Sequence, residues 1–305
     1  MDLETFIIAV FCIVDDFVRD LCHGRRLRQR GPAPVLADSE VLTVEITGEF
    51  LGLDTDHGLH AHFRRHFGHL FPGLRTIHRT TFLRQAANLW AVKQALWQHL
   101  ATGTRHDAAL VLVDSLPVPV CRFARAHRCR SFRGLAAFGY DPPRPRRVRL
   151  RPLAHQTYHG LRLHPRVTWP GVITAAVLTP ANDADRAVAP QLLAGLTGWA
   201  LGDGGYWSPS LRDELAPAGL KLMAPPPRTK AGAVRWPARP VQIRRRIETV
   251  LSQLAERHHA KRVRARDEWH LLARWLRKLA SHTVAVLLCQ RAGLEPLAIA
   301  QLASG

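Results

Sequence analysis

A short apolar run, Ala108–Val113, constrains the fold of this chain more than any other feature. It is too short for a helix of its own and rich in valine and leucine, so it predicts a buried strand. Two further runs, Tyr158–Thr168 and Val172–Thr179, flank the turn residues Trp169–Gly171 and predict a hairpin. Helix and strand patterns alternate after the hairpin. That order predicts an α/β domain built on a mixed sheet with helices on its faces.

The later elements can be placed along the chain from the same patterns. The sequence predicts a helix over 183–196, a strand over 201–203, a helix over 209–215, a strand over 220–223 and, after a proline-rich connection over 225–240, a helix around Glu248 with further helix to about residue 288. We therefore expect the α/β domain to cover residues 106–290. A helical region over 1–105 would precede it, and a tail over 291–305 would follow it.

Residues 1–105 have the pattern of helices joined by loops. The predicted helices cover 2–22, 40–51 after the capping residues Asp38 and Ser39, and a stretch from Thr80 to Leu100. The loops between them are predicted to hold Gly58 and a cluster of basic and histidine residues, His60, His62, Arg64, Arg65 and His66. Two interpretations stand. This region binds DNA, for instance through a helix-turn-helix, or it is a helical cap that packs on the catalytic domain.

The charge of the chain favours a nucleic-acid partner. It carries 43 basic against 24 acidic residues, a formal net charge of +19. A charge this large attracts polyanions in a salt-dependent way. The segment 142–151 holds several arginines among prolines, including Arg146 and Arg147, and predicts an exposed basic loop that follows DNA phosphates. A solvated surface insert is the alternative for that loop.

Five cysteines with loose spacing favour a reducing cytoplasm over a disulfide scaffold. Cys121 and Cys129 flank His127, which leaves a zinc site as one interpretation and inert thiols as the favoured one. The apolar run Phe6–Val14 is too short to span a bilayer and follows acidic rather than basic residues. We therefore expect a cytoplasmic protein without a membrane partner.

Three carboxylates occupy positions from which they could share a divalent-metal site. Asp114 and Asp203 lie at predicted strand ends, and Glu248 lies on the late helix, beside its apolar stripe. Magnesium prefers oxygen ligands, and two Mg²⁺ ions roughly 3.5–4 Å apart can align and activate the nucleophile of a phosphoryl transfer. The alternative is that the aspartates are ordinary turn residues and the glutamate is a surface charge.

Wider motifs make the chain similar to bacterial insertion-sequence transposases of the DDE type, and most similar to insertion sequence family 982. The matching segments follow the family's order along the chain: DSEVLTVEITGEFLGLDTD (38–56), HRTTFLRQAANLW (78–90), VDSLPVPVCRFARAHRCRSFRG (113–134), YHGLRLH (158–164), VLTPANDADR (177–186), LGDGGYW (201–207) and RRRIETVLSQL (244–254). The resemblance implies an RNase H-like core and Mg²⁺-dependent cleavage and strand transfer at the element's own ends. Mn²⁺ is an expected substitute for Mg²⁺.

Carried over residue by residue, the resemblance implies that Asp114, Asp203 and Glu248 are the catalytic metal ligands. Residues at or beside accessory motif positions are expected to contact DNA or to support the carboxylates: Tyr158, Arg162, Asn182, Arg244 and Arg245. Gly204 departs from the family, because a lysine usually stands there. Trp207 follows the second motif and could stack on an unpaired base, with core packing as the alternative.

The reaction implied by the resemblance also implies partners. Synapsis of two ends implies a homodimer that holds the terminal inverted repeats and the target DNA of the nucleoid. Two other functions stay open at this point. The chain could be a decayed or domesticated copy that binds DNA without cutting it, or an RNase H-like nuclease without strand transfer.

Overall fold

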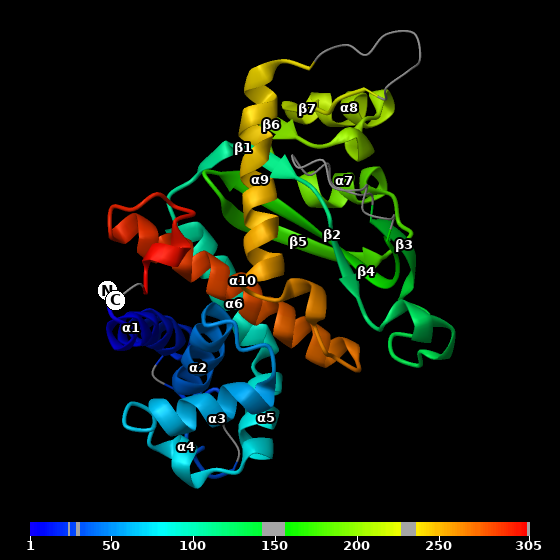
Figure 1. Cartoon of the computed structure of the whole chain (residues 1–305). Helices are drawn as coiled ribbons and strands as arrows, with labels where there is room; N and C mark the ends of the chain where they lie inside the picture. The colour runs from blue at the N-terminus through cyan, green and yellow to red at the C-terminus, as the bar shows by residue number, and fades with distance from the viewer. Residues whose placement is uncertain (24, 29–30, 142–155, 227–235, 304–305) are drawn as a thin grey trace, which may run out of the picture. The chain divides into compact units, whose positions relative to one another are not determined.

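The computed structural model covers the whole chain and describes every residue except 24, 29–30, 142–155, 227–235 and 304–305. The chain forms two compact units (Figure 1). The helical unit comprises Met1–Arg105, Ser252–Ala260 and Glu268–Gly305, and the sheet unit comprises His106–Leu251 and Lys261–Asp267. The sequence pattern extends the α/β domain to residue 290. The structure instead groups the last long helix with the N-terminal helices.

The described helices of the helical unit include α1 (Leu3–Cys22), α2 (Asp38–Phe50), α3 (Asp56–His66), α4 (Gly73–Thr76), α5 (Arg79–Asn88), α6 (Trp90–Gly103) and α10 (Glu268–Arg291). Helix α2 is buried along almost its whole length. It packs against α1 on one side and α10 on another, and α10 also packs along α6. The C-terminal helix therefore completes the core of the N-terminal region, which explains the grouping.

Two helix predictions need correction. The segment 60–66, predicted as a loop, lies in α3, where the hydroxyl of Thr55 caps the first turn by accepting a hydrogen bond from the amide of Gly58 at 3.1 Å. This cap, together with the buried Leu59 and Phe63, outweighs the cost of a glycine in the first turn. The helix predicted from Thr80 onward is two helices, because Leu89 ends α5 and a new helix begins after it.

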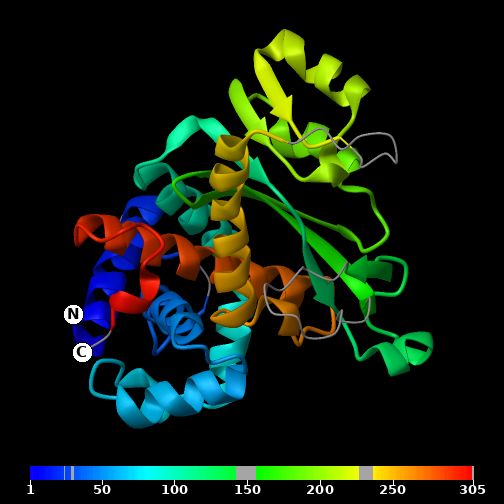
Figure 2. The same cartoon turned by 45° about the horizontal axis from the view of Figure 1, so that its top comes forward.

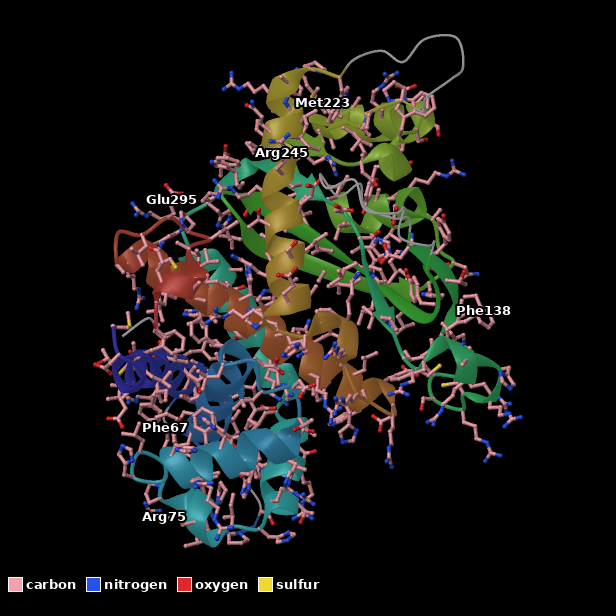
Figure 3. All side chains as sticks on the ribbon, in the orientation of Figure 1. Phe67, Arg75, Phe138, Met223, Arg245 and Glu295 are labelled. Carbon is pink, nitrogen blue, oxygen red and sulfur yellow. The ribbon has the colours of Figure 1, made fainter. Side chains whose placement is uncertain are left out.

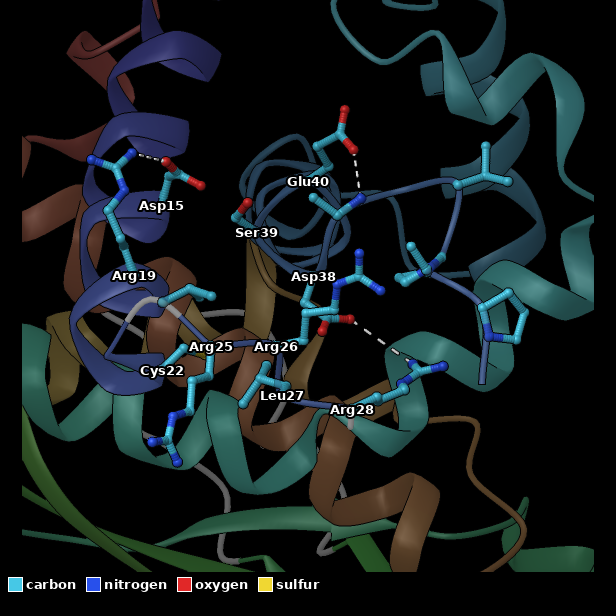
Figure 4. A pocket seen from close by; sticks show the side chains of 16 residues that line it. Asp15, Arg19, Cys22, Arg25, Arg26, Leu27, Arg28, Asp38, Ser39 and Glu40 are labelled. Carbon is cyan, nitrogen blue, oxygen red and sulfur yellow. Dashed lines mark hydrogen bonds and ion pairs between the residues drawn. The ribbon is translucent and has the colours of Figure 1, made fainter. Parts of the chain in front are cut away.

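A pocket of the helical unit lies beside the start of α2 (Figure 4). Its acidic groups are engaged within the protein. The carboxylate of Glu40 accepts a hydrogen bond from the amide of Ala37 at 2.6 Å, and Asp38 lies 3.9 Å from the guanidinium of Arg28. These contacts fix the point at which the chain enters α2 and indicate a structural role for the pocket.

Buried ion pairs join α2, α3 and α10. Arg277 donates hydrogen bonds to Glu49 at 2.5 Å and to Asp56 at 2.7 Å, and Lys278 donates to the other oxygen of Glu49 at 2.6 Å. Glu49, Arg277 and Lys278 are almost completely buried. Charges at such depth are tolerated only when they are paired and hydrogen-bonded. The network therefore makes the packing of these helices depend on specific partners.

The stability of the helical unit should depend on pH through Asp56. Burial alone would raise its pKa, but the neighbouring Arg277 and Arg274 hold the pKa of Asp56 at about 2, below the ordinary value of 3.8. The carboxylate therefore contributes its full stabilisation above about pH 4, roughly 2 kcal/mol, and loses it as the pH falls through about 2. We expect the urea midpoints of the wild type and of Asp56→Asn to differ at neutral pH and to converge in acid. A difference that stays constant with pH would contradict this.

The described residues of the sheet unit form a seven-stranded mixed sheet. Its strands are β1 (Asp107–Val113), β2 (Leu116–Pro119), β3 (Ala137–Asp141), β4 (Gln156–Trp169), β5 (Val172–Pro180), β6 (Gly198–Leu201) and β7 (Leu220–Met223). Strands β1, β6 and β7 are parallel neighbours, and β4 is antiparallel to β1. Strands β2, β3 and β5 each pair antiparallel with β4. The predicted mixed sheet and its hairpin, β4 with β5, are confirmed.

The strand predicted over 201–203 lies earlier, at β6. Gly198 starts this strand with a positive φ of 94°, and a side chain on it would come within 2.3 Å of the carbonyl oxygen of Ala109. Glycine thus allows β6 to begin close against β1. The strand ends before Asp203, which caps a short 3₁₀ helix over Gly204–Tyr206. The helix and strand predicted over 209–215 and 220–223 are confirmed as α8 (Pro209–Leu215) and β7.

Helices cover the sheet. One hydrophobic core joins β1, β6 and β7 to α8 and to α7 (Asp185–Leu193), with Val111, Ala189, Ala200 and Tyr206 among its fully buried members. Helix α9 (Ala238–Glu256) runs across the sheet in Figures 1 and 2, and its Ile247, Val250 and Leu251 are completely buried. Among the described residues, none of the helices combines the length and the apolar character needed to cross a membrane.

Candidate active site

Asp114 and Asp203 follow neighbouring parallel strands of the sheet. Leu112 of β1 pairs with Leu201 of β6, and each aspartate comes two residues after its member of this pair. The amide of Ser115 donates to Asp114 Oδ1 at 2.7 Å, which fixes that carboxylate at the end of its strand. Because the carboxyl ends of parallel neighbours share one edge of a sheet, the fold brings these two predicted residues to the same place.

Arg244 connects the third carboxylate to the first. It lies one helical turn before Glu248 on α9 and donates a hydrogen bond to Glu248 Oε1 at 2.7 Å. Its other terminal nitrogen lies 3.9 Å from Asp114 Oδ2. Burial raises the pKa of Asp203, and the positive charge of Arg244 acts in the opposite direction. One guanidinium therefore interacts with all three predicted carboxylates.

Asp185, at the start of α7, is a fourth carboxylate of this site that sequence reasoning did not single out. A methyl group on Gly205 would lie 2.6 Å from Asp185 Oδ2 and 3.0 Å from Asp203 Oδ1, so both carboxylates border the same small space. Burial raises the pKa of Asp203, the amide of Gly205 lowers it, and the negative charge of Asp185 raises it further. A second cation at this edge would relieve that repulsion.

Tyr206 lies close enough to the carboxylates to sense their charges, and sequence reasoning did not predict a role for it either. Its side chain is completely buried, and its hydroxyl has no hydrogen-bond partner among the described residues. Burial, followed by the charges of Asp185, Asp114 and Asp203, raises the pKa of Tyr206 well above its ordinary value. A side chain at Gly202 would come within 2.8 Å of the Tyr206 ring, so this position needs glycine. Gly202 and Tyr206 both belong to the motif LGDGGYW at 201–207, which contained the signal for these two residues.

The accessory residues on β4 are turned into the protein. Arg162 donates to Asp185 Oδ1 at 3.3 Å and to the carbonyl oxygen of Tyr140 at 3.2 Å. The side chain of Tyr158 is buried, and His164 is completely buried with its Nε2 3.0 Å from the hydroxyl of Thr179. These positions suit support of the carboxylates, which is one of the two roles predicted for Tyr158 and Arg162.

The other predicted DNA contacts face solvent where they are described. Arg245 on α9, Asn182 and Trp207 are exposed, and Figure 3 labels Arg245 on that helix. Arg146 and Arg147 lie outside the described residues. Arg246, the residue after Arg245, packs over the ring of Trp169 at 4.9 Å from its centre, which ties α9 to the end of β4.

The donor set suits a hard divalent cation, because carboxylate oxygens are the ligands that Mg²⁺ prefers. Arg244 already brings one positive charge among these carboxylates, so the cluster accommodates a cation. Among the described residues, however, no three of the carboxylate oxygens lie within 4.8 Å of one another. Joint coordination of one ion by three of these carboxylates would therefore require them to move closer together.

The family model described as a transposase DDE domain matches residues 104–268, which is more than half of the chain. The matched region contains Asp114, Asp185, Asp203 and Glu248. No curated protein and no solved structure matches the chain.

Proposed function

We propose that this chain, which belongs to the transposase DDE domain family, cleaves DNA at the ends of its own insertion sequence and joins those ends to target DNA. The observation that carries the proposal is the family match over 104–268, which includes every carboxylate of the candidate site. Its net charge of +19 suits a protein that binds DNA along an extended path. The resemblance of its motifs to insertion sequence family 982 supports that finer assignment.

The sheet unit supports an RNase H-like catalytic core. A parallel trio, β1, β6 and β7, next to the antiparallel β4 and β5 is the arrangement that the family's core would require. Asp114 and Asp203 would hold divalent metal from the strand ends, and Glu248 would complete the set from α9. Members of this family generally use divalent ions, and we propose Mg²⁺. Such ions supply Lewis-acid stabilisation of the phosphate and a lowered pKa for the attacking hydroxyl.

The surrounding residues would prepare the carboxylates for that ion. Arg162 holds Asp185 in place through its contact at 3.3 Å, and the amide of Gly205 holds Asp203. Arg244 keeps the negative charges of Asp114 and Glu248 compensated while no ion is bound. If Glu248 were instead to hold a divalent ion, the same guanidinium would be available to a DNA phosphate, for which arginine offers two parallel donors.

DNA contacts in this proposal come from both units. Arg245 and Trp207 are exposed on the sheet unit and suit a phosphate and an unpaired base. The helical unit has a pocket over α3 and α5 lined by His57, His60, Ala61, Arg64, Arg65, Arg75, Ile77, His78 and Arg79. This basic lining favours DNA binding by the N-terminal region over a purely structural cap. Arg146 and Arg147 remain predicted contacts.

An assay on the element's own ends tests the proposal. Purified protein is incubated with DNA that carries the inverted repeats flanking this gene, in Mg²⁺, in Mn²⁺ and in a chelator. We expect cleavage that depends on the metal. With precut ends and a target plasmid, we expect joined products that form in a homodimeric complex. The buffer should match the salt and pH of the bacterial cytoplasm, where we expect the protein to act. Cleavage without joining would favour a nuclease. Binding without cleavage in either metal would favour a decayed or domesticated copy.

Restoring the family's lysine at Gly204 should strengthen DNA binding. Among the described residues a side chain there has room, because the nearest of their atoms to its Cβ would be the carbonyl oxygen of Pro225 at 3.8 Å. We expect Gly204→Lys to bind repeat DNA several-fold more tightly and to steepen the salt dependence by about one phosphate contact. Fluorescence anisotropy over a range of salt concentrations measures both. Gly204→Gln is the matched neutral control, and equal salt slopes for the two variants would contradict the prediction.

A further inference from the structure

The segment between β2 and β3 places two thiols close to an imidazole of β4. Cys121 follows β2, Cys129 directly follows the 3₁₀ helix Phe123–Arg128, and His159 is the fourth residue of β4. One ligand atom from each residue lies within 4.8 Å of the other two, and the Cys121 Sγ and His159 Nδ1 atoms are 3.9 Å apart. The sequence suggested His127 as the third member. The structure brings in His159 instead, from a strand thirty residues further along.

We propose that Cys121, Cys129 and His159 bind a zinc ion that cross-links the segment between β2 and β3 to the sheet. Two thiolates and one imidazole are a soft donor set that suits Zn²⁺ and differs from the oxygen donors of the candidate active site. A tetrahedral ion with Zn–S bonds near 2.3 Å and a Zn–N bond near 2.0 Å would place its ligand atoms about 3.5–3.8 Å apart. Because each pair of observed atoms lies within 4.8 Å, the atoms would reach that geometry by closing through at most about 1.3 Å. A water molecule would complete the four-coordinate shell.

The backbone around the site is held in register before any ion binds. The amide of Val120 donates to the carbonyl oxygen of His159 at 3.1 Å, which places Cys121 directly beside β4. A side chain on Gly160 would come within 2.2 Å of the carbonyl oxygen of Val118, so glycine lets β2 approach His159 closely. Two of the three ligands are therefore positioned by the sheet itself, which lowers the entropy cost of assembling the site.

The third ligand comes from a segment that has little other reason to be ordered. Of the described residues 121–136, Ala126 and Phe132 alone are buried. The Cys129 thiol donates a long hydrogen bond to the carbonyl oxygen of Ser131 at 3.7 Å. A stretch that buries so little apolar surface gains stability from a metal cross-link, as small domains with small cores do. On binding, each thiol would release its proton to solvent and become a thiolate ligand.

The ion would also fix the positions of the side chains that this segment exposes to solvent. Its exposed arginines are Arg122, Arg125, Arg128, Arg130 and Arg133. The ring of His159 meets the ring of Phe138 edge-on at 5.0 Å between centres, and Figure 3 labels Phe138 beside this part of the sheet. Phe138 in turn meets Phe123, and both phenylalanines are more than half exposed. The cross-link would hold a basic and aromatic surface, the combination that contacts nucleic acid, in one conformation.

Metal analysis of the purified full-length protein tests the proposal. We expect one zinc per chain by mass spectrometry of the metal, and a thiolate-to-metal charge-transfer band after exchange with Co²⁺. Cys121→Ser, Cys129→Ser and His159→Ala should each weaken zinc binding by more than about 100-fold. Cys22→Ser, His127→Ala and Asp114→Asn are matched controls that should keep the zinc. Loss of zinc in His127→Ala with retention in His159→Ala would overturn the assignment, as would a metal-free protein with a Cys121–Cys129 disulfide.

A second measurement avoids variants that fail to fold. The exposed arginines between Cys121 and Gly134 are trypsin sites, so cleavage within this segment reports its local opening. Removing zinc from the wild-type protein with a chelator should speed cleavage there by at least about tenfold and leave sites in the helical unit unchanged. Adding Zn²⁺ back should restore protection, whereas Mg²⁺ should not. Equal cleavage rates with and without zinc would overturn the proposal.

Discussion

Asp203→Asn is expected to lower the rate of DNA-end cleavage by more than about 1,000-fold, a loss of at least about 4 kcal/mol of transition-state stabilisation. The reason is charge. An amide binds a divalent ion far more weakly than a carboxylate, whereas its oxygen can still accept the hydrogen bond from the amide of Gly205, now 2.9 Å from Asp203 Oδ1. The substitution would therefore remove the proposed metal ligand and preserve the local backbone.

The same experiment must show that DNA binding survives. Asp203→Asn removes one negative charge from a strongly basic chain, so its affinity for repeat DNA should be equal to or slightly above that of the wild type. Asp213→Asn is the matched control, because Asp213 is a solvent-exposed aspartate on α8 that pairs only with its neighbour Arg212 among the described contacts. Cleavage by Asp203→Asn at a rate within tenfold of the control would remove this carboxylate from the metal site.

Parallel variants separate the roles of the other carboxylates. Asp114→Asn and Glu248→Gln should match the loss seen for Asp203→Asn, because each would remove a metal ligand. Asp185→Asn should cost less and should weaken the dependence of the rate on Mg²⁺ concentration, since Asp185 acts through its charge on Asp203 and its contact with Arg162. An Asp185 variant as inactive as Asp203→Asn would instead make it a metal ligand.

The main α/β elements could be predicted from the sequence because their signals are local. The hairpin around Trp169–Gly171 has two long strand patterns on either side of a turn, and α8 begins with Ser208 and Pro209, a capping residue and a favoured first helical residue. The apolar stripe of α9 likewise predicts which side is buried, and Ile247 and Val250 are indeed completely buried.

Other elements could not be predicted from the sequence, because they depend on contacts with distant parts of the chain. Strand β2 contains Pro117 and Pro119, which lack an amide donor and argue against a strand until β4 is seen to pair with it. Asp185 occupies the first turn of a helix, where an acidic residue is ordinary. Asp185 comes close to Asp203 only through the tertiary fold, in which both carboxylates lie against Gly205. Local patterns cannot reveal such contacts.

The buried charges of the helical unit are the clearest case of long-range information. Arg277 contacts Glu49 and Asp56 across more than two hundred residues of sequence. In a linear pattern, Arg277 and Lys278 inside α10 have the character of a solvated helix face. Their burial shows that α10 completes the N-terminal core rather than extending the α/β domain, which is the point at which the predicted boundary at residue 290 departs from the structure.

Arg277→Met should therefore destabilise the helical unit by roughly 3–5 kcal/mol, the cost of leaving buried carboxylates without their partner. Methionine fills much of the same volume, so the loss would reflect charge rather than a cavity. Glu49 would keep only Lys278, at 2.6 Å, and Glu45 would keep only Lys93, at 2.5 Å, among the described ion pairs. Urea unfolding of the full chain, followed by far-UV circular dichroism, measures the change.

Two further variants decide whether pairing is the cause. Arg291→Met, at the exposed end of the same helix, should change the free energy of unfolding by no more than about 0.5 kcal/mol. Arg277→Lys should fall between that control and Arg277→Met, because lysine restores the charge but cannot reach Glu49 and Asp56 together through a rigid fork of donors. Equal stability of Arg277→Met and Arg291→Met would mean that the buried network contributes nothing net to folding. The helices of this unit would then be held by their apolar contacts alone.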